Sequence, residues 1–187
     1  NLRIARELFP AQRAELVTFG SDSSEMRPVQ RRELISPVNI LALGNDMHRD
    51  WDTLIKACGG WSECEVKIGG KRIGRTLQRQ SRHFSNLEIV TPKSAAELKQ
   101  LYEWADLVVI PLKSNSHASG ITVINEAIIS GVPVICTDTG GIRSYFSGDE
   151  IYYIPLAAPN RLRDAIEELS RDDNLRFAIA RRAQARI

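Results

Sequence analysis

A short polar segment directly before an apolar helix carries the residues with the clearest chemical potential. Ser119, Gly120 and Thr122 stand immediately before the expected helix, and Glu126 lies about one turn beyond Thr122 on the same face. A helix N-terminus leaves backbone N–H groups free and carries roughly half a positive charge. A glycine there lets a phosphate approach the main chain closely. We therefore expect the amides of residues 120–123 to hold a diphosphate while the Glu126 carboxylate accepts hydrogen bonds from a ribose diol.

The alternative is structural: the segment is a plain N-cap and Glu126 a solvated helix residue, because Ser and Thr cap many helices. The rest of the helix argues against a solvated face. Its other residues are mostly apolar: Val123, Ile124, Ala127, Ile128 and Ile129. A buried carboxylate without a partner is costly. The pattern therefore favours a half-buried Glu126 that has a partner, and a functional role.

Elements that could position this segment alternate along the chain from residue 38 onward. The apolar runs predict strands at 38–44, 65–70, 87–90, 105–112, 132–137 and 151–155. Amphipathic stretches predict helices at 51–58, 72–82 and 94–105, one ended by Gly131, and two from about residue 160 to the end. This alternation indicates an α/β fold with a doubly wound parallel sheet. Ligands bind beyond the carboxyl ends of such strands, here after Leu43, Ile68, Val90, Leu112 and Cys136.

The first 37 residues have a different character. Residues 1–22 contain a predicted helix and a predicted strand, and we interpret them as the remnant of a preceding N-terminal domain with its hinge. A polar, proline-containing linker follows at 23–37, and residues 38–187 form the expected Rossmann-like domain. The first residue is Asn1, so we expect a fragment of a longer protein.

Composition narrows the function classes. A net charge of +2 and a pI of about 8.5 do not indicate nucleic-acid binding. No apolar run approaches the ~20 residues of a membrane span. The cysteines Cys58, Cys64 and Cys136 lack the spacing of a zinc site or a disulfide framework, which favours a reducing, cytoplasmic location. Asp46, His48 and Asp50 alternate within one loop, and we interpret them as caps and surface groups rather than as metal ligands.

Two segments together carry a family resemblance. "SGITVINEAIISGVPVICTDTGGI" resembles the nucleotide-sugar-binding half of GT-B glycosyltransferases of group 1, whose pattern is approximately E-G-F-G-x-x-x-x-E-A-x-x-x-G-x-P-V-x-x-x-x-x-G-G. "ELKQLYEWADLVVIPLKSN" is similar to the family's L-x-x-x-Y-x-x-A-D-x-x-x-x-P-S. "ILALGNDMHRDWDTLIKA" is similar to its first strand, phosphate loop and helix, and "LVTFGSD" to its hinge. The resemblance covers nearly the whole chain.

The resemblance implies a set of site residues. Glu126 matches the family's ribose-binding glutamate, whereas the preceding acidic position of that motif is Ala118. The family's phosphate-gripping arginine falls on Asn45 and its lysine on Arg49, and Lys71 or Arg72 could replace the lost cation. The expected nucleotide-sugar site comprises Glu126, Ser119, Gly120, Ile121, Thr122, Val123, Arg49, Asn45, Lys71, Val90, Thr91 and His117. No catalytic residue is assigned, and the resemblance implies no metal and no cofactor.

The resemblance also implies a function. It is transfer of a sugar, of the hexosyl type and with retention, from a nucleoside diphosphate sugar such as a UDP-sugar. The acceptor is a hydroxyl on a glycan or lipid-linked molecule, held by a missing N-terminal domain, so the fragment alone should be inactive. A basic stripe at Arg72, Arg75, Arg79 and Arg82 is either a solvated face or a contact with the inner face of the membrane. Two alternatives stay open: a nucleotide-sugar epimerase of the same architecture, and a non-catalytic nucleotide-binding module.

Overall fold

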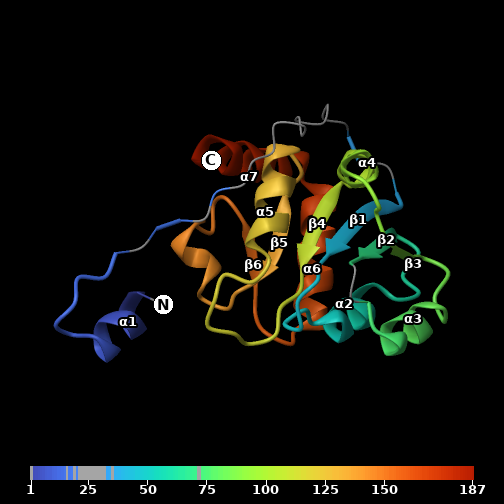
Figure 1. Cartoon of the computed structure of the whole chain (residues 1–187). Helices are drawn as coiled ribbons and strands as arrows, with labels where there is room; N and C mark the ends of the chain where they lie inside the picture. The colour runs from blue at the N-terminus through green and yellow to red at the C-terminus, as the bar shows by residue number, and fades with distance from the viewer. Residues whose placement is uncertain (1, 16, 19, 21–32, 35, 71–72) are drawn as a thin grey trace.

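Six parallel strands form the centre of the molecule. The computed structural model describes residues 2–15, 17–18, 20, 33–34, 36–70 and 73–187. The strands are β1 (Val38–Leu43), β2 (Cys64–Gly69), β3 (Leu87–Val90), β4 (Leu107–Ile110), β5 (Val134–Thr137) and β6 (Tyr152–Ile154). Their order in the sheet is β3-β2-β1-β4-β5-β6, and every neighbouring pair is parallel (Figure 1). The predicted doubly wound parallel sheet is confirmed.

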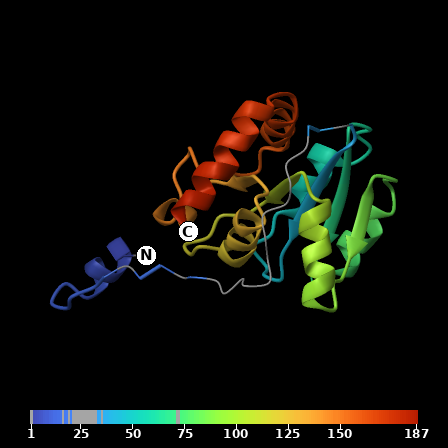
Figure 2. The ribbon, with the colours of Figure 1, turned by 90° about the horizontal axis from the view of Figure 1, so that it is seen from above.

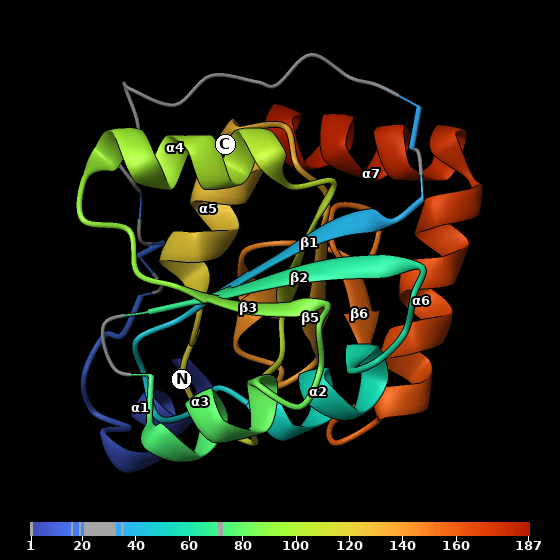
Figure 3. The same cartoon turned by 90° about the vertical axis from the view of Figure 1, so that its right-hand side faces the viewer.

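Helices cover both faces of the sheet (Figure 3). On one face lie α2 (Trp51–Cys58), α3 (Arg75–Ser81) and α6 (Pro159–Arg171), which bury Leu54, Leu77 and Ile166 against the strands. On the other face lie α4 (Ala95–Trp104), α5 (Ile121–Ile129) and α7 (Asp173–Arg186), seen from above in Figure 2. Because both faces of the sheet are covered, the central strands β1, β4 and β5 are apolar along almost their whole length.

The order of the strands reverses between β1 and β4. A carboxylate fixes this junction, since Asp106 Oδ2 accepts a hydrogen bond from the Asn39 N–H (2.9 Å) and the Asp106 N–H donates to the Asn39 carbonyl (2.8 Å). The Asn39 side chain adds a bond from Nδ2 to the Trp104 carbonyl (3.1 Å). These contacts fix the amino ends of the two strands, which pair in parallel. Their carboxyl ends lie at the switch point where doubly wound sheets bind ligands.

Two local predictions differ from the structure. Helix α1 (Leu2–Leu8) is present, but the described residues of 9–20 contain no strand, and Val17 is 86% exposed. An apolar run becomes a strand only where a neighbouring strand accepts its hydrogen bonds. The sequence analysis also did not predict the short 3₁₀ helix η1 (Ile142–Ser144) after β5.

Among the described residues, no helix has the length and apolar character that crossing a membrane requires.

Candidate nucleotide-sugar site

A cavity of about 920 Å³ lies beyond the carboxyl ends of β1 and β4. Three connections wall it: the β1–α2 loop, the β3–α4 loop, and the β4–α5 loop with the first turn of α5. At the base of the cavity, the backbone segments that follow β1 and β2 approach each other closely. A Cβ on Gly70 would lie 2.1 Å from the Gly44 carbonyl oxygen, so this approach requires glycine. The volume suits a small-molecule ligand of nucleotide-sugar size.

Most of the predicted site residues meet in this cavity. Those that line it are Asn45, Arg49, Thr91, His117, Ser119, Gly120, Ile121, Thr122, Val123 and Glu126. Val90 does not line the cavity, because it ends β3 and packs beside Gly69, while Thr91 and Pro92 continue to the cavity wall. Lys71 and Arg72 lie outside the described residues. Ala118 is also part of the wall, at the position where the resembled motif has an acidic residue.

The start of α5 presents free amides to the cavity. Its N-cap is Gly120, which has a φ of +88° and gives no side-chain cap, so the interpretation of a plain Ser or Thr cap is wrong. In the described part of the chain, no group accepts from the N–H of Thr122 or of Val123, whereas the Ile124 N–H donates to the Gly120 carbonyl (2.9 Å). These orphan donors and the helix dipole together favour an anion.

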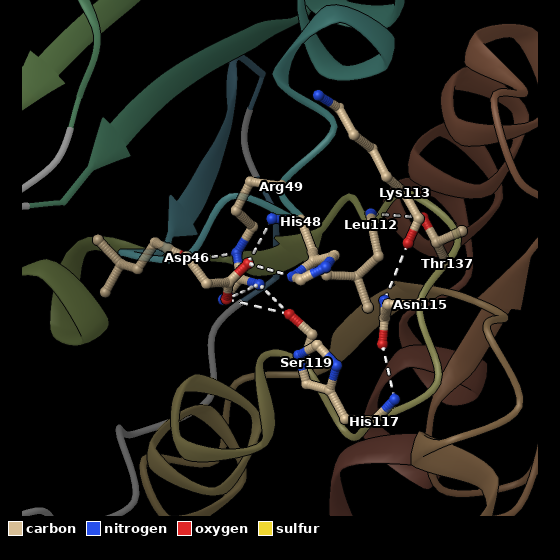
Figure 4. A network of polar contacts seen from close by, with 10 residues as sticks. Asp46, His48, Arg49, Leu112, Lys113, Asn115, His117, Ser119 and Thr137 are labelled. Carbon is tan, nitrogen blue, oxygen red and sulfur yellow. Dashed lines mark hydrogen bonds and ion pairs between the residues drawn. The ribbon is translucent and has the colours of Figure 1, made fainter.

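Arg49 joins two of the cavity walls (Figure 4). Its Nε donates to the Leu43 carbonyl (3.0 Å), and its Nη1 donates both to Asp46 Oδ2 (2.9 Å) and to Ser119 Oγ (3.1 Å). The Ser119 hydroxyl in turn donates to Asp46 Oδ2 (3.0 Å). An isolated bridge between Arg49 and Leu112 ties the same loop to the end of β4. The loop after β1 is thus locked to the residue that precedes Gly120.

Arg49 is almost fully buried, at 3% exposure. Burial lowers its pKa from the ordinary value, and the carboxylate of Asp46 opposes that effect. Arginine stays charged under such conditions, so Arg49 supplies a fixed cation beside the amides of α5. Among the described residues lining the cavity, Lys93 of the β3–α4 loop is a second cation, and it is exposed. Asp46 and Lys93 both line the cavity, and neither is among the site residues expected from the sequence.

Glu126 has the partner that its apolar surroundings predict. The Tyr102 hydroxyl, on α4, donates to Glu126 Oε2 at 2.7 Å. Burial raises the pKa of the Glu126 carboxyl, and the bond from Tyr102 acts in the opposite direction. Tyr102 is fully buried, whereas Glu126 is half-buried and lines the cavity. Tyr102 stands in the segment that resembles the family's second motif, but its sequence gave no sign of a contact with Glu126.

His117 lies in a loop that is held by hydrogen bonds within the loop and by contacts with other parts of the chain (Figure 4). Its N–H donates to Asn115 Oδ1 (3.2 Å), and Asn115 Nδ2 donates to the Lys113 carbonyl (2.9 Å). The rings of His117 and His48 meet edge to face at 4.7 Å. The loop after β5 passes close to this segment. A Cβ on Gly141 would lie 2.5 Å from the His117 carbonyl oxygen, so position 141 requires glycine.

The alternating Asp46, His48 and Asp50 do not form a metal centre. Asp50 is the N-cap of α2 and accepts from the Thr53 N–H (3.2 Å) and hydroxyl (2.7 Å), as a cap should. Asp46 is committed to Arg49 and Ser119. Within the described ranges, no three His, Cys, Asp or Glu side chains converge as metal ligands would.

Comparison with known proteins agrees with this architecture. A family model described as "Glycosyl transferases group 1" matches residues 37–172. A curated relative, the D-inositol 3-phosphate glycosyltransferase of Corynebacterium aurimucosum, is 28% identical over 152 residues, which is 78% of this chain and 34% of that protein. The chain therefore spans about a third of the length of that relative.

Solved structures share the fold at low sequence identity. Sucrose-phosphate synthase from Thermosynechococcus elongatus superposes with a TM-score of 0.81 at 18% identity, over 98% of this chain and 50% of that one. The C-terminal domain of a glycosyl transferase group 1 family protein from Francisella tularensis gives 0.70 at 16% identity, over 89% of this chain and 95% of that one. HepE from Anabaena, solved in complex with UDP and glucose, gives 0.68 at 18% identity, over 80% of this chain and 43% of that one.

Proposed function

Because the chain belongs to the group 1 glycosyltransferases, we propose that residues 38–187 are the donor-binding domain of a glycosyltransferase and bind a nucleoside diphosphate sugar. A uridine nucleotide is the first candidate, since a protein of the same fold was solved with UDP and with UDP-glucose. The whole protein would transfer a hexosyl group, with retention, to a hydroxyl of a glycan or lipid-linked acceptor. The acceptor would be held by a further domain, which fits a chain that spans a third of its relative.

The observation that carries this proposal is one cavity that combines free amides with a carboxylate. The N–H groups of Thr122 and Val123 would donate to the diphosphate, beside the fixed charge of Arg49. Glu126, one turn further along α5, would accept from the ribose hydroxyls. Thr91 and Pro92 would face the base from the β3–α4 loop.

These groups also suggest how the leaving group would be stabilised. When the sugar leaves, negative charge grows on the diphosphate, where preorganised N–H donors and a buried guanidinium stabilise it most effectively. We propose that this domain needs no divalent metal for that step, because the amides of α5 and Arg49 meet the anion. A donor-binding half without its acceptor half should bind nucleotide and transfer little or no sugar, so steady transfer by the 187-residue chain would contradict the proposal.

A binding panel tests the function directly. UDP, GDP, ADP and their sugars are titrated into the chain by calorimetry, with and without EDTA, and thermal shift serves as a second readout. A ligand present at about a hundred times its dissociation constant stabilises the folded state by roughly 2.7 kcal/mol. We expect a nucleoside diphosphate to bind, with UDP strongest and with no effect of EDTA. Failure of every nucleotide to bind would refute the proposal.

Ala118 supports a second candidate, a non-catalytic nucleotide-binding module. It lines the cavity at the position where the resembled motif carries an acidic residue, so one polar contact to the donor is missing. The full-length protein decides between the two, because only an enzyme releases nucleotide and glycosylates an acceptor. Conversion of the donor sugar in the absence of any acceptor would instead indicate an epimerase.

A further inference from the structure

Tyr102 lies at the base of the wall that Glu126 contributes to the cavity. It is among the largest fully buried side chains, with 0% exposure, and its ring packs in the apolar cluster between α4, α5 and the sheet. Its hydroxyl donates to Glu126 Oε2 at 2.7 Å, and the two residues are 24 positions apart. In the described part of the chain, Glu126 Oε1 accepts no hydrogen bond.

A phenol hydroxyl in an apolar cluster needs a partner, because burying it without one costs free energy. Glu126 is that partner, and the relationship is reciprocal. The ring of Tyr102 cannot move without repacking its cluster, so its hydroxyl is a fixed point on which the flexible glutamate side chain is anchored.

We propose that Tyr102 is a positioning residue for nucleotide binding: its hydroxyl anchors Glu126 Oε2 so that Oε1 stays available in the cavity for the ribose hydroxyls. This inference rests on the proposed function and goes beyond it. Tyr102 itself is buried beneath the wall and is not among the residues that line the cavity. Its effect on the ligand therefore acts through Glu126.

The electrostatics provide a signature that a merely structural tyrosine would lack. Burial and the neighbouring charge of Glu126 raise the pKa of Tyr102 well above its ordinary value, so the hydroxyl keeps its proton and remains a donor. The guanidinium of Arg49, in the β1–α2 loop, acts in the opposite direction on Tyr102. Burial raises the pKa of Glu126, and the bond from Tyr102 lowers it. Removing the hydroxyl leaves burial unopposed, so Glu126 should take up a proton at a higher pH.

The test compares UDP binding by the wild-type chain and by Tyr102→Phe from mildly acidic to neutral pH. We expect Tyr102→Phe to bind UDP about five- to tenfold more weakly at neutral pH, the range expected for one net hydrogen bond. We also expect its loss of binding in acid to begin at a higher pH. Glu126→Gln, measured in parallel, reports the pH dependence that does not come from Glu126, including that of the ligand phosphate and of the other side chains that line the cavity. Tyr153→Phe is the matched control, because Tyr153 donates to the Phe146 carbonyl (2.9 Å) away from the cavity and should change neither quantity.

The outcomes separate the inference from the function on which it rests. If the wild-type chain binds no nucleotide, the proposed function fails and the inference with it. If the wild type binds UDP, and if Tyr102→Phe binds it equally well and loses binding in acid at the same pH as the wild type, the inference alone is overturned. Should Tyr102→Phe fail to fold, a ring-fluorinated tyrosine at position 102 keeps the ring and strengthens the donor. The loss of UDP binding in acid should then begin at a lower pH than in the wild type, and an unchanged pH would overturn the inference.

Discussion

Arg49 Nη1 and Ser119 Oγ lie 3.1 Å apart, although 70 residues separate them in the sequence. Both also bind the same oxygen of Asp46. This contact joins the loop after β1 to the loop after β4, the two strands at which the sheet order reverses. The N-terminal end of α5, where we propose that the diphosphate binds, is therefore held in place before any ligand arrives, which lowers the cost of ordering the site on binding.

Replacing Arg49 should weaken both the fold and the site. Arg49→Ala removes the donor to the Leu43 carbonyl and leaves the partly exposed Asp46 carboxylate without its cation. We expect a loss of about 1–3 kcal/mol in the free energy of unfolding, and weaker UDP binding. Arg49→Lys should lie between the wild type and Arg49→Ala in both stability and UDP affinity, because the lysine ammonium cannot reproduce the planar fork of the guanidinium. Urea unfolding and calorimetry measure both effects.

The control for Arg49 is Arg143→Ala. Arg143 forms an ion pair with Asp138 (2.7 Å), is 49% exposed and does not line the cavity. Its removal should change stability by less than about 1 kcal/mol. An Arg49→Ala variant that unfolds at the wild-type urea concentration and binds UDP normally would show that the network is incidental.

Gly120 is a second position at which backbone geometry and binding are coupled. Its φ is +88°, and a Cβ there would lie 2.7 Å from Ile110 Cγ2. We expect Gly120→Ala to destabilise the fold by about 1–3 kcal/mol and to weaken UDP binding, because the first turn of α5 must move. Gly74→Ala is the matched control: Gly74 is the N-cap of α3, its φ is −68°, and nothing lies within 4 Å of a Cβ there. Equal losses of UDP affinity in the two variants would contradict this prediction.

The pH dependence of the protein's stability should report the protonation of the Glu126 carboxyl. Its pKa in the folded protein is raised by burial, so the folded state binds a proton more readily than the unfolded state. Ionisation of Glu126 as pH rises through that pKa therefore lowers stability. Without ligand, Glu126→Gln should melt at a higher temperature than the wild type at neutral pH, and the difference should shrink in acid. A glutamine variant that is less stable at neutral pH would assign Glu126 a structural role.

Much of the fold follows from the sequence because the central strands β1, β4 and β5 are buried on both faces and therefore read as apolar runs. "LEIV" is β3, and the helix predicted at 51–58 is α2. The ends of elements are predicted less accurately than their cores. The helix predicted from Arg72 begins at Arg75, because Gly74 is its N-cap and has an extended backbone. The strand expected before Gly20 lacks a described partner, and pairing is a property of the whole sheet.

The site was predictable where it depends on one local segment. Gly120 and Glu126 are in register on a single helix, so their spacing placed both on the cavity. The contacts of Tyr102 and Asp46 could not be read in the same way. Tyr102 reaches Glu126 only because α4 and α5 pack on the same face of the sheet, and Asp46 reaches Ser119 only because β1 and β4 are neighbours.

The proposed role of Glu126 in ribose recognition is tested most directly by UDP and its 2′-deoxy and 3′-deoxy analogues, titrated into the wild type and Glu126→Gln. The amide oxygen of glutamine can still accept from Tyr102, so the fold should survive. A hydrogen bond to a charged group contributes roughly 1.5–3 kcal/mol, so Glu126→Gln should bind UDP about ten- to a hundredfold more weakly. Each deoxy analogue should lose affinity for the wild type and much less for the variant. Wild-type affinity of Glu126→Gln for UDP, with equal losses for the analogues in both proteins, would contradict the account.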